Sequence, residues 1–217
     1  MTDPQRVVLL VGSPKGLNAG SSVRLGRAIT APLEEAGWHC DAFHLHAAIR
    51  AEDAMSDLLV SLDAASLVVL AAPLYVDSLP APVIHAMHEI ALHRAEVTDG
   101  RTPRFLSIIN CGFVEPWQNE GAQQMLELFC GRAKFESIGA LSLGAAGAMN
   151  RNVRKALQLV VEALHDDVLI PNIVGELLSR RVIPQSLYIL GGNVMWKRQA
   201  KRNGVRDQIK AQPYKRT

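Results

Sequence analysis

Cysteine is scarce in this chain, and its placement excludes several classes of protein. Cys40, Cys111 and Cys130 are the only cysteines among 217 residues, and no two of them form a C-x-x-C pair. An odd number of widely spaced cysteines is typical of free thiols in a reducing compartment. We therefore expect a cytoplasmic protein that has neither a disulfide framework nor a cysteine-bound iron–sulfur cluster.

Long apolar segments are also missing from the sequence. No run approaches the roughly 18 apolar residues that a membrane-spanning helix needs. The first residues lead directly into an apolar strand and do not have the layout of a signal peptide. We therefore expect no membrane partner.

Several familiar catalytic and phosphate-binding motifs do not occur. There is no Lys-Ser or Lys-Thr pair for a Walker A loop, no G-x-G-x-x-G dinucleotide fingerprint and no G-x-S-x-G nucleophile elbow. His85, His88 and His93 fall on one predicted helix, but no H-E-x-x-H arrangement accompanies them. We interpret these histidines as a solvated or partly buried face and predict no metal site.

The net charge is small but unevenly distributed. The whole chain carries +2, whereas residues 170–217 contain ten Lys/Arg and two Asp/Glu, a net +8 that leaves −6 for residues 1–169. A basic tail on an acidic body is able to bind nucleic acid, to lie on the body or to reach a ligand phosphate. The tail has no recognisable nucleic-acid recognition motif, so we do not expect nucleic acid as a partner.

The most informative stretch runs from the first strand into the first helix. Residues 7–11 are all apolar, as in a strand buried on both faces, and a polar loop begins at Gly12. Ser21 and Ser22 are candidates for the N-cap of the helix that follows. A helix N-terminus leaves backbone N–H groups unpaired and carries a partial positive charge. The stretch therefore predicts either an anion site or an ordinary turn between strand and helix.

Strands and helices alternate along the rest of the chain. Further strands are expected at residues 38–45, 67–72, 104–110 and 135–143, helices at residues 52–62, 81–97, 120–132 and 152–165, and a turn at residues 98–103. In the tail, helices are expected at residues 174–181, 185–190 and 194–203. This alternation requires right-handed crossovers and predicts an α/β fold whose parallel sheet is covered on both faces.

Three loops that follow strand ends carry unusual chemistry, at residues 12–22, 73–80 and 110–119. In open α/β sheets, ligands bind beyond the carboxyl ends of the strands. The first loop is polar and suits a phosphate. The other two combine aromatic side chains with small and polar residues, which suits a flat and partly polar ring. Together the three loops predict a site for a mononucleotide such as FMN.

Three motifs in these loops carry a family resemblance. They are Gly-Ser-Pro-Lys at residues 12–15, Pro-Leu-Tyr-Val-Asp-Ser-Leu-Pro-Ala-Pro at residues 73–82 and Asn-Cys-Gly-Phe at residues 110–113. On these motifs, residues 6–145 resemble the NAD(P)H-dependent FMN reductase-like family of the flavodoxin-fold superfamily. The resemblance implies a flavodoxin-like, three-layer, doubly wound fold with a five-stranded parallel sheet in the order 2-1-3-4-5. It also implies FMN at the strand ends and a homodimer or a dimer of dimers.

The resemblance further implies the organisation of the chain and the residues of the site. Residues 1–169 are expected to form the FMN-binding domain, and residues 170–217 a basic C-terminal extension packed on it. The implied phosphate ligands are Ser13, Lys15, Asn18, Ser21 and Ser22. The implied ring contacts are Pro73, Leu74, Tyr75, Val76, Asp77 and Ser78 on one side, and Asn110, Cys111, Gly112 and Phe113 on the other. The first loop is longer than the family's at residues 16–20, so the individual phosphate ligands stay open.

The activity that the resemblance implies is that of an NAD(P)H-dependent FMN oxidoreductase. A hydride from NADH or NADPH would pass to the flavin, which would then reduce a quinone, a free flavin, a nitro or azo compound or a metal ion. No side chain has to act as an acid or a base in the first half-reaction, so no catalytic residue is nominated. Tyr75 and Glu115 are either substrate-orienting residues or ordinary loop residues, and Cys111 lacks a resolving partner for a redox role.

Two other functions remain open on the sequence alone. The first is a flavodoxin-type electron carrier without turnover of its own. The sequence pI of ≈ 8.5 counts against it, because such carriers are usually strongly acidic. The second is a binding module that has kept the fold and lost the flavin. Separately from these alternatives, the basic tail is expected to lie across the body or a dimer partner and to present Lys and Arg near the ligand pocket, in place to meet an NADP 2′-phosphate.

Overall fold

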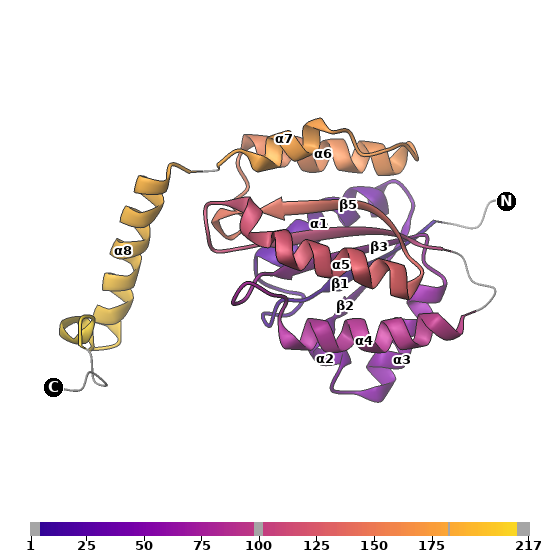
Figure 1. Cartoon of the computed structure of the whole chain (residues 1–217), viewed down its shortest axis with the longest axis horizontal. Coiled ribbons are helices and arrows are strands. Elements are labelled where there is room, and N and C mark those ends of the chain that lie inside the picture. Colours follow the sequence, from indigo (N-terminus) through magenta and orange to yellow (C-terminus); the bar gives the residue numbers. More distant parts are fainter. Residues whose placement is uncertain (1–4, 98–101, 182, 212–217) are drawn as a thin grey trace. The chain divides into compact units, whose positions relative to one another are not determined.

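Five parallel strands form a single sheet (Figure 1). The structure is a computed structural model, and it describes residues 5–97, 102–181 and 183–211. The strands are β1 (Arg6–Val11), β2 (His39–His44), β3 (Leu67–Pro73), β4 (Arg104–Asn110) and β5 (Glu136–Leu143). They are hydrogen-bonded in the order β2-β1-β3-β4-β5, which confirms the predicted strand order and the doubly wound topology.

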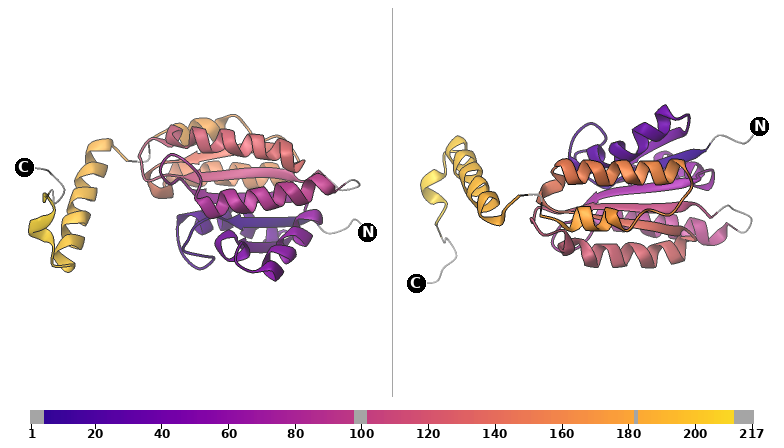
Figure 2. Two further views of the ribbon diagram at one scale, coloured as in Figure 1. Left: turned by 60° about the horizontal axis from the view of Figure 1, so that its bottom comes forward. Right: turned by 90° about the horizontal axis from the view of Figure 1, so that it is seen from above.

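Helices cover both faces of this sheet, as Figure 2 shows. One face packs against α1 (Ser21–Glu35), α6 (Arg151–His165) and α7 (Ile173–Ser179). The other face packs against α2 (Leu45–Ala48), α3 (Glu52–Asp63), α4 (Ala81–Glu96) and α5 (Glu120–Ala133). Two short 3-10 helices, η1 (Pro116–Asn119) and η2 (Ala145–Gly147), lie in the loops after β4 and β5.

The apolar strands form the core in the way their sequence pattern predicts. All seven residues of β3 are buried, and β1 is buried from Val7 to Val11. Successive side chains of a strand point to opposite faces, so Leu9 packs with α1 and α6 while Leu10 packs with α2 to α4. Burying a side chain of this size contributes about 1.5–3 kcal/mol. The sheet is therefore a rigid base for the loops at its carboxyl edge.

The start of α1 differs from the prediction. Gly20 is the N-cap residue, with a φ of 108°, and Ser21 and Ser22 are the first two helical residues. The predicted N-cap role of these serines is therefore wrong. The chain enters the helix through a backbone conformation that only glycine adopts without strain, which moves the cap one residue toward the N-terminus.

The C-terminal helices also differ from the prediction. The segments expected at residues 185–190 and 194–203 form one helix, α8 (Gln185–Arg202), followed by η3 (Arg206–Gln208). Gly191 and Gly192 lie between the two expected segments and are helical, because glycine weakens a helix by about 1 kcal/mol without forbidding its dihedral angles. The expected turn at residues 98–103 lies mostly outside the described residues.

The internal contacts of the chain fall into two units, residues 1–182 and 183–217. α7 belongs to the first unit, where Val174, Leu177 and Leu178 are buried and the helix contacts α6 and β5. In the second unit, neither α8 nor η3 contains a buried residue. Of the helices in the described ranges, none combines the length and the apolar character that crossing a membrane requires.

A partly buried ion-pair network links α3, α4 and α5 at the end of the sheet that lies away from the loops. Arg94 of α4 is 1% exposed, and its Nη1 donates to Asp63 Oδ1 of α3 at 2.9 Å. His93 Nε2 lies 2.7 Å from the other carboxylate oxygen, and Arg94 Nε donates to Ala133 O of α5 at 3.3 Å. Burial alone would raise the pKa of Asp63, but the hydrogen bonds and charges of His93 and Arg94 outweigh it and lower this pKa.

We predict that Asp63→Asn lowers the free energy of unfolding at pH 7 and that this loss disappears in acid. The pKa of Asp63 is lower in the folded than in the unfolded protein. Its contribution is therefore present above the unfolded value, about 3.9, and is lost as pH falls through the folded value. Urea unfolding at several pH values measures it. Asp57→Asn, which removes an exposed carboxylate from the same helix, should change stability little, and an equal loss in both variants would contradict the network.

Candidate functional site

Asn110 joins three loops at the carboxyl edge of the sheet. It ends β4 and is 6% exposed. Its main-chain carbonyl accepts a hydrogen bond from Leu74 N at 2.9 Å, and its side-chain Oδ1 accepts one from Ser22 Oγ at 3.0 Å. The loops after β1, β3 and β4, which sequence reasoning combined into one site, therefore meet at this residue.

The N-terminus of α1 lies at this junction and has no side-chain cap. Gly20 makes no side-chain capping hydrogen bond, and the first turn contains no acidic residue. The first N–H groups of a helix have no acceptor within the helix, and the helix dipole adds a partial positive charge. This is the donor set that binds the phosphate of a nucleotide in many α/β proteins.

The two serines at the start of α1 have different environments. Ser22 is buried, and its hydroxyl donates a hydrogen bond to Asn110 Oδ1. This side chain therefore links two loops. Ser21 is half-buried and lies close to Gly147: a Cβ placed on Gly147 would be 3.4 Å from Ser21 Cβ. Of the predicted pair, Ser21 is therefore the one whose hydroxyl is better placed to meet a ligand.

Ser13 and Lys15 lie beside the same helix N-terminus. A Cβ placed on Gly20 would lie 3.4 Å from Lys15 Cδ and 3.5 Å from Ser13 Oγ. Ser13 is buried and its Oγ accepts a hydrogen bond from Lys15 N at 3.3 Å, whereas the Lys15 side chain is exposed. The structure thus brings Ser13, Lys15 and Ser21 together, while Asn18 is an exposed residue of the long loop.

The loop after β3 forms a tight reverse turn. Tyr75 N donates to Ser78 O at 2.8 Å and Ser78 N donates to Tyr75 O at 3.1 Å. Val76 and Asp77, at the tip, have φ values of 51° and 58°, a left-handed conformation that is strained for a β-branched residue. Val76 is 98% exposed, and Ser78 Oγ anchors the turn on Met125 Sδ of α5 at 3.7 Å.

Cys111 supports the loop after β4 and is not built for redox chemistry. Its side chain is buried, and its Sγ lies 3.7 Å from Phe113 O and 3.6 Å from Glu115 O. Burial raises the pKa of the Cys111 thiol. A protonated and buried thiol is a poor nucleophile, so its place in the site is structural.

A fourth loop, after β5, belongs to the site although it was not among the three predicted loops. Ala145 N donates to Phe113 O at 2.5 Å and Ala146 N donates to Cys111 O at 2.7 Å, so η2 supports the loop after β4. On the other side, Arg24 Nη2 of α1 donates to Gly147 O at 3.0 Å. The glycine-rich sequence at residues 144–147 was visible, but its contacts with distant residues were not.

Glu115 and Trp117 are held by an arginine that sequence reasoning did not single out. Arg181 Nη2 lies 3.6 Å from Glu115 Oε1, and its guanidinium lies 5.8 Å from the centre of the Trp117 ring. Glu115 therefore has an ionic partner within the protein and is not free to orient a substrate by charge. Tyr75 is 47% exposed, so its side chain is accessible to orient a substrate.

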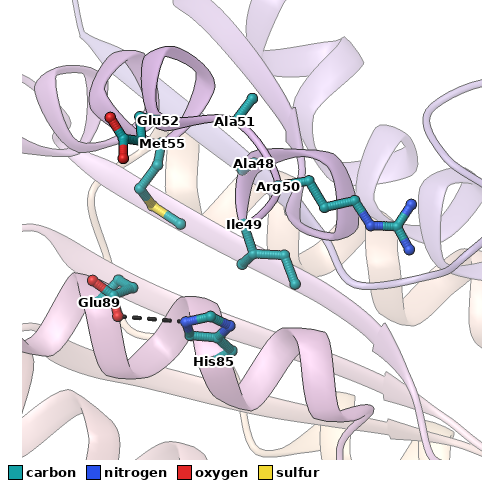
Figure 3. A pocket seen from close by; sticks show the side chains of 8 residues that line it. All are labelled: Ala48, Ile49, Arg50, Ala51, Glu52, Met55, His85 and Glu89. Atoms are coloured by element: carbon teal, nitrogen blue, oxygen red, sulfur yellow. Dashed lines mark ion pairs between the residues drawn. The ribbon is translucent and has the colours of Figure 1, made fainter.

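A hollow of about 340 Å³ lies away from the candidate site, between the α2–α3 connection and α4 (Figure 3). His85 and Glu89 of α4 form an ion pair across 3.5 Å at its wall, with Met55 and Ile49 opposite. Its lining mixes both charges with apolar groups and does not include the predicted loops. Within the described residues, no group of three or more His, Cys, Asp or Glu side chains forms a metal site.

The fold is similar to solved structures of flavin-dependent proteins. An FMN-dependent NADH-azoreductase from Bacillus anthracis str. Ames Ancestor, solved with FMN, has a TM-score of 0.56 and 12% identity over 74% of this chain and 99% of that one. The NADH:FMN oxidoreductase EMOB, in its apo form, has a TM-score of 0.57 and 14% identity over 84% of this chain and 98% of that one. A flavodoxin from Pseudomonas aeruginosa, solved as a point mutant, has a TM-score of 0.50 and 14% identity over 74% of this chain and 99% of that one.

These likenesses show the fold of the chain. The chain has a flavodoxin-like α/β fold, and it is structurally similar to FMN-dependent NAD(P)H reductases at low sequence identity. No protein-family model matches the sequence, and no curated protein matches it significantly. Reductases and a flavodoxin share this fold, so the activity has to be argued from the site itself.

We predict that Ser22→Ala destabilises the protein by about 1–3 kcal/mol, because it leaves the buried Asn110 Oδ1 without its hydrogen-bond donor. Ser21→Ala removes the same hydroxyl from the neighbouring position and should cost less than about 0.5 kcal/mol. Chemical unfolding of both variants in the absence of flavin measures the difference. Equal effects would show that the contact between Ser22 and Asn110 does not hold the loops together.

Proposed function

We propose that this site binds FMN and that the protein is an NAD(P)H-dependent flavin oxidoreductase. The observation that carries the proposal is the uncapped N-terminus of α1, joined through Ser22 and Asn110 to the two loops with exposed aromatic side chains. A phosphate donor set beside flat apolar surfaces matches the two ends of a flavin mononucleotide. The similarity to FMN-dependent structures supports the same reading.

The residues present fit the two parts of FMN. In this proposal, the first-turn N–H groups of α1, with Ser13, Lys15, Asn18 and Ser21, hold the phosphate, while Ser22 holds the loops together. The turn at residues 73–78 and the loop at residues 110–113 hold the ring. Bound FMN would accept a hydride from NADH or NADPH and return two electrons to a second small molecule.

The exposure of the ring loops favours an enzyme over a carrier. Tyr75, Phe113 and Trp117 are 47%, 51% and 54% exposed, so a second substrate has access to the same face. The sequence pI of ≈ 8.5 differs from the strong acidity that lets flavodoxin-type carriers dock on basic partners.

A quinone, a free flavin, a nitro or azo compound or a metal ion remains the proposed acceptor. The three free cysteines agree with the proposed cytoplasmic location.

A carboxylate at Ser21 tests the phosphate site. Ser21→Asp should raise the free energy of unfolding by about 0.3–1 kcal/mol, because an acidic residue in the first turn is favourable to the helix dipole. The same charge should weaken FMN binding at least about tenfold, since it repels a phosphate a few ångströms away. Flavin fluorescence titration and urea unfolding measure the two effects. Ser21→Asn is the neutral control, and tight FMN binding by Ser21→Asp would contradict the site.

Anaerobic addition of NADPH or NADH to the FMN-loaded protein separates the two candidate functions. Rapid loss of flavin absorbance at about stoichiometric nucleotide would identify an oxidoreductase and its donor. Flavin that stays oxidised with both nucleotides would support the carrier, for which the flavodoxin match is the structural precedent. A chain that retains no FMN would leave the fold without the proposed activity.

We also propose that the protein is a homodimer in which α8 contacts a second copy. Leu187, Leu190 and Val194 share one side of this helix and are 58%, 61% and 41% exposed. An 18-residue helix with two central glycines is marginal on its own, so it needs a partner. Residues 185–211 carry six Lys/Arg and one Asp, a net +5, while residues 1–169 carry −6, so the acidic body of a second copy is the complementary surface.

Sedimentation velocity of the full chain tests this contact. Leu190→Asp should shift the protein toward monomer, and 0.5 M salt should do the same because it screens the charges. Asn193→Asp introduces the same charge on another side of α8 and should leave the oligomeric state unchanged. A wild type that sediments as a monomer at micromolar concentration would contradict the proposal.

A further inference from the structure

Two histidines, one at the end of β2 and one in α2, are hydrogen-bonded to the loop that begins the candidate phosphate site. His46 Nε2 lies 3.1 Å from Gly12 O, and His44 Nε2 lies 2.9 Å from Ser13 O. A carbonyl oxygen only accepts hydrogen bonds, so both Nε2 atoms carry the proton. The two rings are stacked, with centroids 5.4 Å apart and planes at 7°. The two rings therefore donate hydrogen bonds to two consecutive carbonyls of one loop.

The sheet order explains why these residues meet. β2 is the neighbour of β1, and the parallel register pairs Val11 with His44, the last residues of the two strands. The chain leaves β2 directly into α2, which contains His46. Strand end and first helical turn thus place both imidazoles against the loop that leaves β1. A Cβ on Gly16, whose φ is 74°, would lie 3.9 Å from His44 Cε1, so the ring also packs under the turn of the loop.

The hydrogen bonds fix the orientation of the peptide groups. The N–H and C=O of a trans peptide point in opposite directions. Because the carbonyl of Gly12 points to His46, the N–H of Ser13 points away from the histidines. Pro14 has no N–H, and Ser13 O also accepts a hydrogen bond from Gly16 N at 3.2 Å. The carbonyls of the loop are therefore drawn to the β2 side, away from an anion at the start of α1.

We propose that His44 and His46 are positioning residues for phosphate binding: both hold the carbonyls of the first loop away from the anion, and His46 supplies positive charge to the site when it is protonated. This proposal rests on the proposed binding of FMN and names the residues that shape its phosphate subsite. Neither histidine belongs to the loops on which the resemblance depends.

The charge of His46 is coupled to the ligand. Burial, together with the charges of His44 and Arg50, lowers the pKa of His46, and the hydrogen bond to Gly12 O only partly offsets this. The ring is therefore neutral at pH 7, with Nδ1 unprotonated. Lys15, on the loop itself, is a further positive group on this side of the site. A phosphate dianion nearby favours the imidazolium, so binding takes up protons and the contribution of His46 to FMN affinity grows as the pH falls.

Flavin titrations of four variants test the proposal. His44→Leu and His46→Leu remove a donor to the loop and should each raise the Kd of FMN about tenfold, as expected for one lost hydrogen bond. Riboflavin, which lacks the phosphate, should bind these variants and the wild type alike. His44→Gln and His46→Gln keep an N–H donor without the charge and should restore FMN affinity at pH 7.5. His39→Gln, at the other end of β2, is the matched control.

The pH profile distinguishes positioning from mere structural support. Between pH 7.5 and 5.5, the ratio of the Kd of His46→Gln to that of the wild type should rise about threefold, which is part of the tenfold per pH unit of a full proton linkage. The titration of the FMN phosphate itself affects both proteins equally and cancels in this ratio. Thermal unfolding of each variant shows whether it is folded.

The outcomes separate this proposal from the proposed function. Selective loss of FMN affinity in the leucine variants, rescue by glutamine and a rising ratio in acid support it. Equal FMN binding by the wild type and the leucine variants, or an equal loss of FMN and riboflavin, overturns it and leaves FMN binding intact as a function. A wild type that binds neither flavin overturns the proposed function and this inference with it.

Discussion

The candidate site depends on one buried side chain, Asn110. Its side-chain amide oxygen accepts a hydrogen bond from the Ser22 hydroxyl, and its main-chain carbonyl accepts one from Leu74 N–H. These contacts join the loops of β1, β3 and β4, three adjacent strands whose carboxyl ends meet where the strand order reverses. A buried acceptor that loses its donor costs about 1–3 kcal/mol, so each loop is held by the others. The phosphate end and the ring end of the site are therefore positioned together.

The sequence was sufficient to predict the elements that local pattern determines. Consecutive apolar residues predicted β1 and β3, and alternation with helices predicted a parallel sheet. The strand order came from the family resemblance and is confirmed. The two C-terminal helix segments were separated wrongly, because the glycines between them weaken a helix without ending it.

The parts of the site that the sequence could not predict depend on contacts between residues far apart in the chain. Arg24 reaches Gly147 and Arg181 reaches Glu115, separations of 123 and 66 residues that no local motif encodes. The turn at residues 75–78 uses Val76 and Asp77 at positive φ, where asparagine and glycine are the usual residues. Strain of this kind persists only where the surrounding structure holds it, and such positions cluster at functional sites.

A phosphate loop has to present N–H groups to the anion and turn its carbonyls away. Walker loops and dinucleotide fingerprints achieve this with glycines at fixed positions, and this chain has neither motif. Its loop instead contains Pro14, which removes one donor, and two of its carbonyls accept hydrogen bonds from imidazoles at the end of β2 and in α2. The N–H groups in the first turn of α1 are left as the main donors, and no side chain of the N-cap residue caps them. The division of the loop into a carbonyl side at β2 and an N–H side at α1 follows from the sheet order, because only a neighbour of β1 is able to reach those carbonyls.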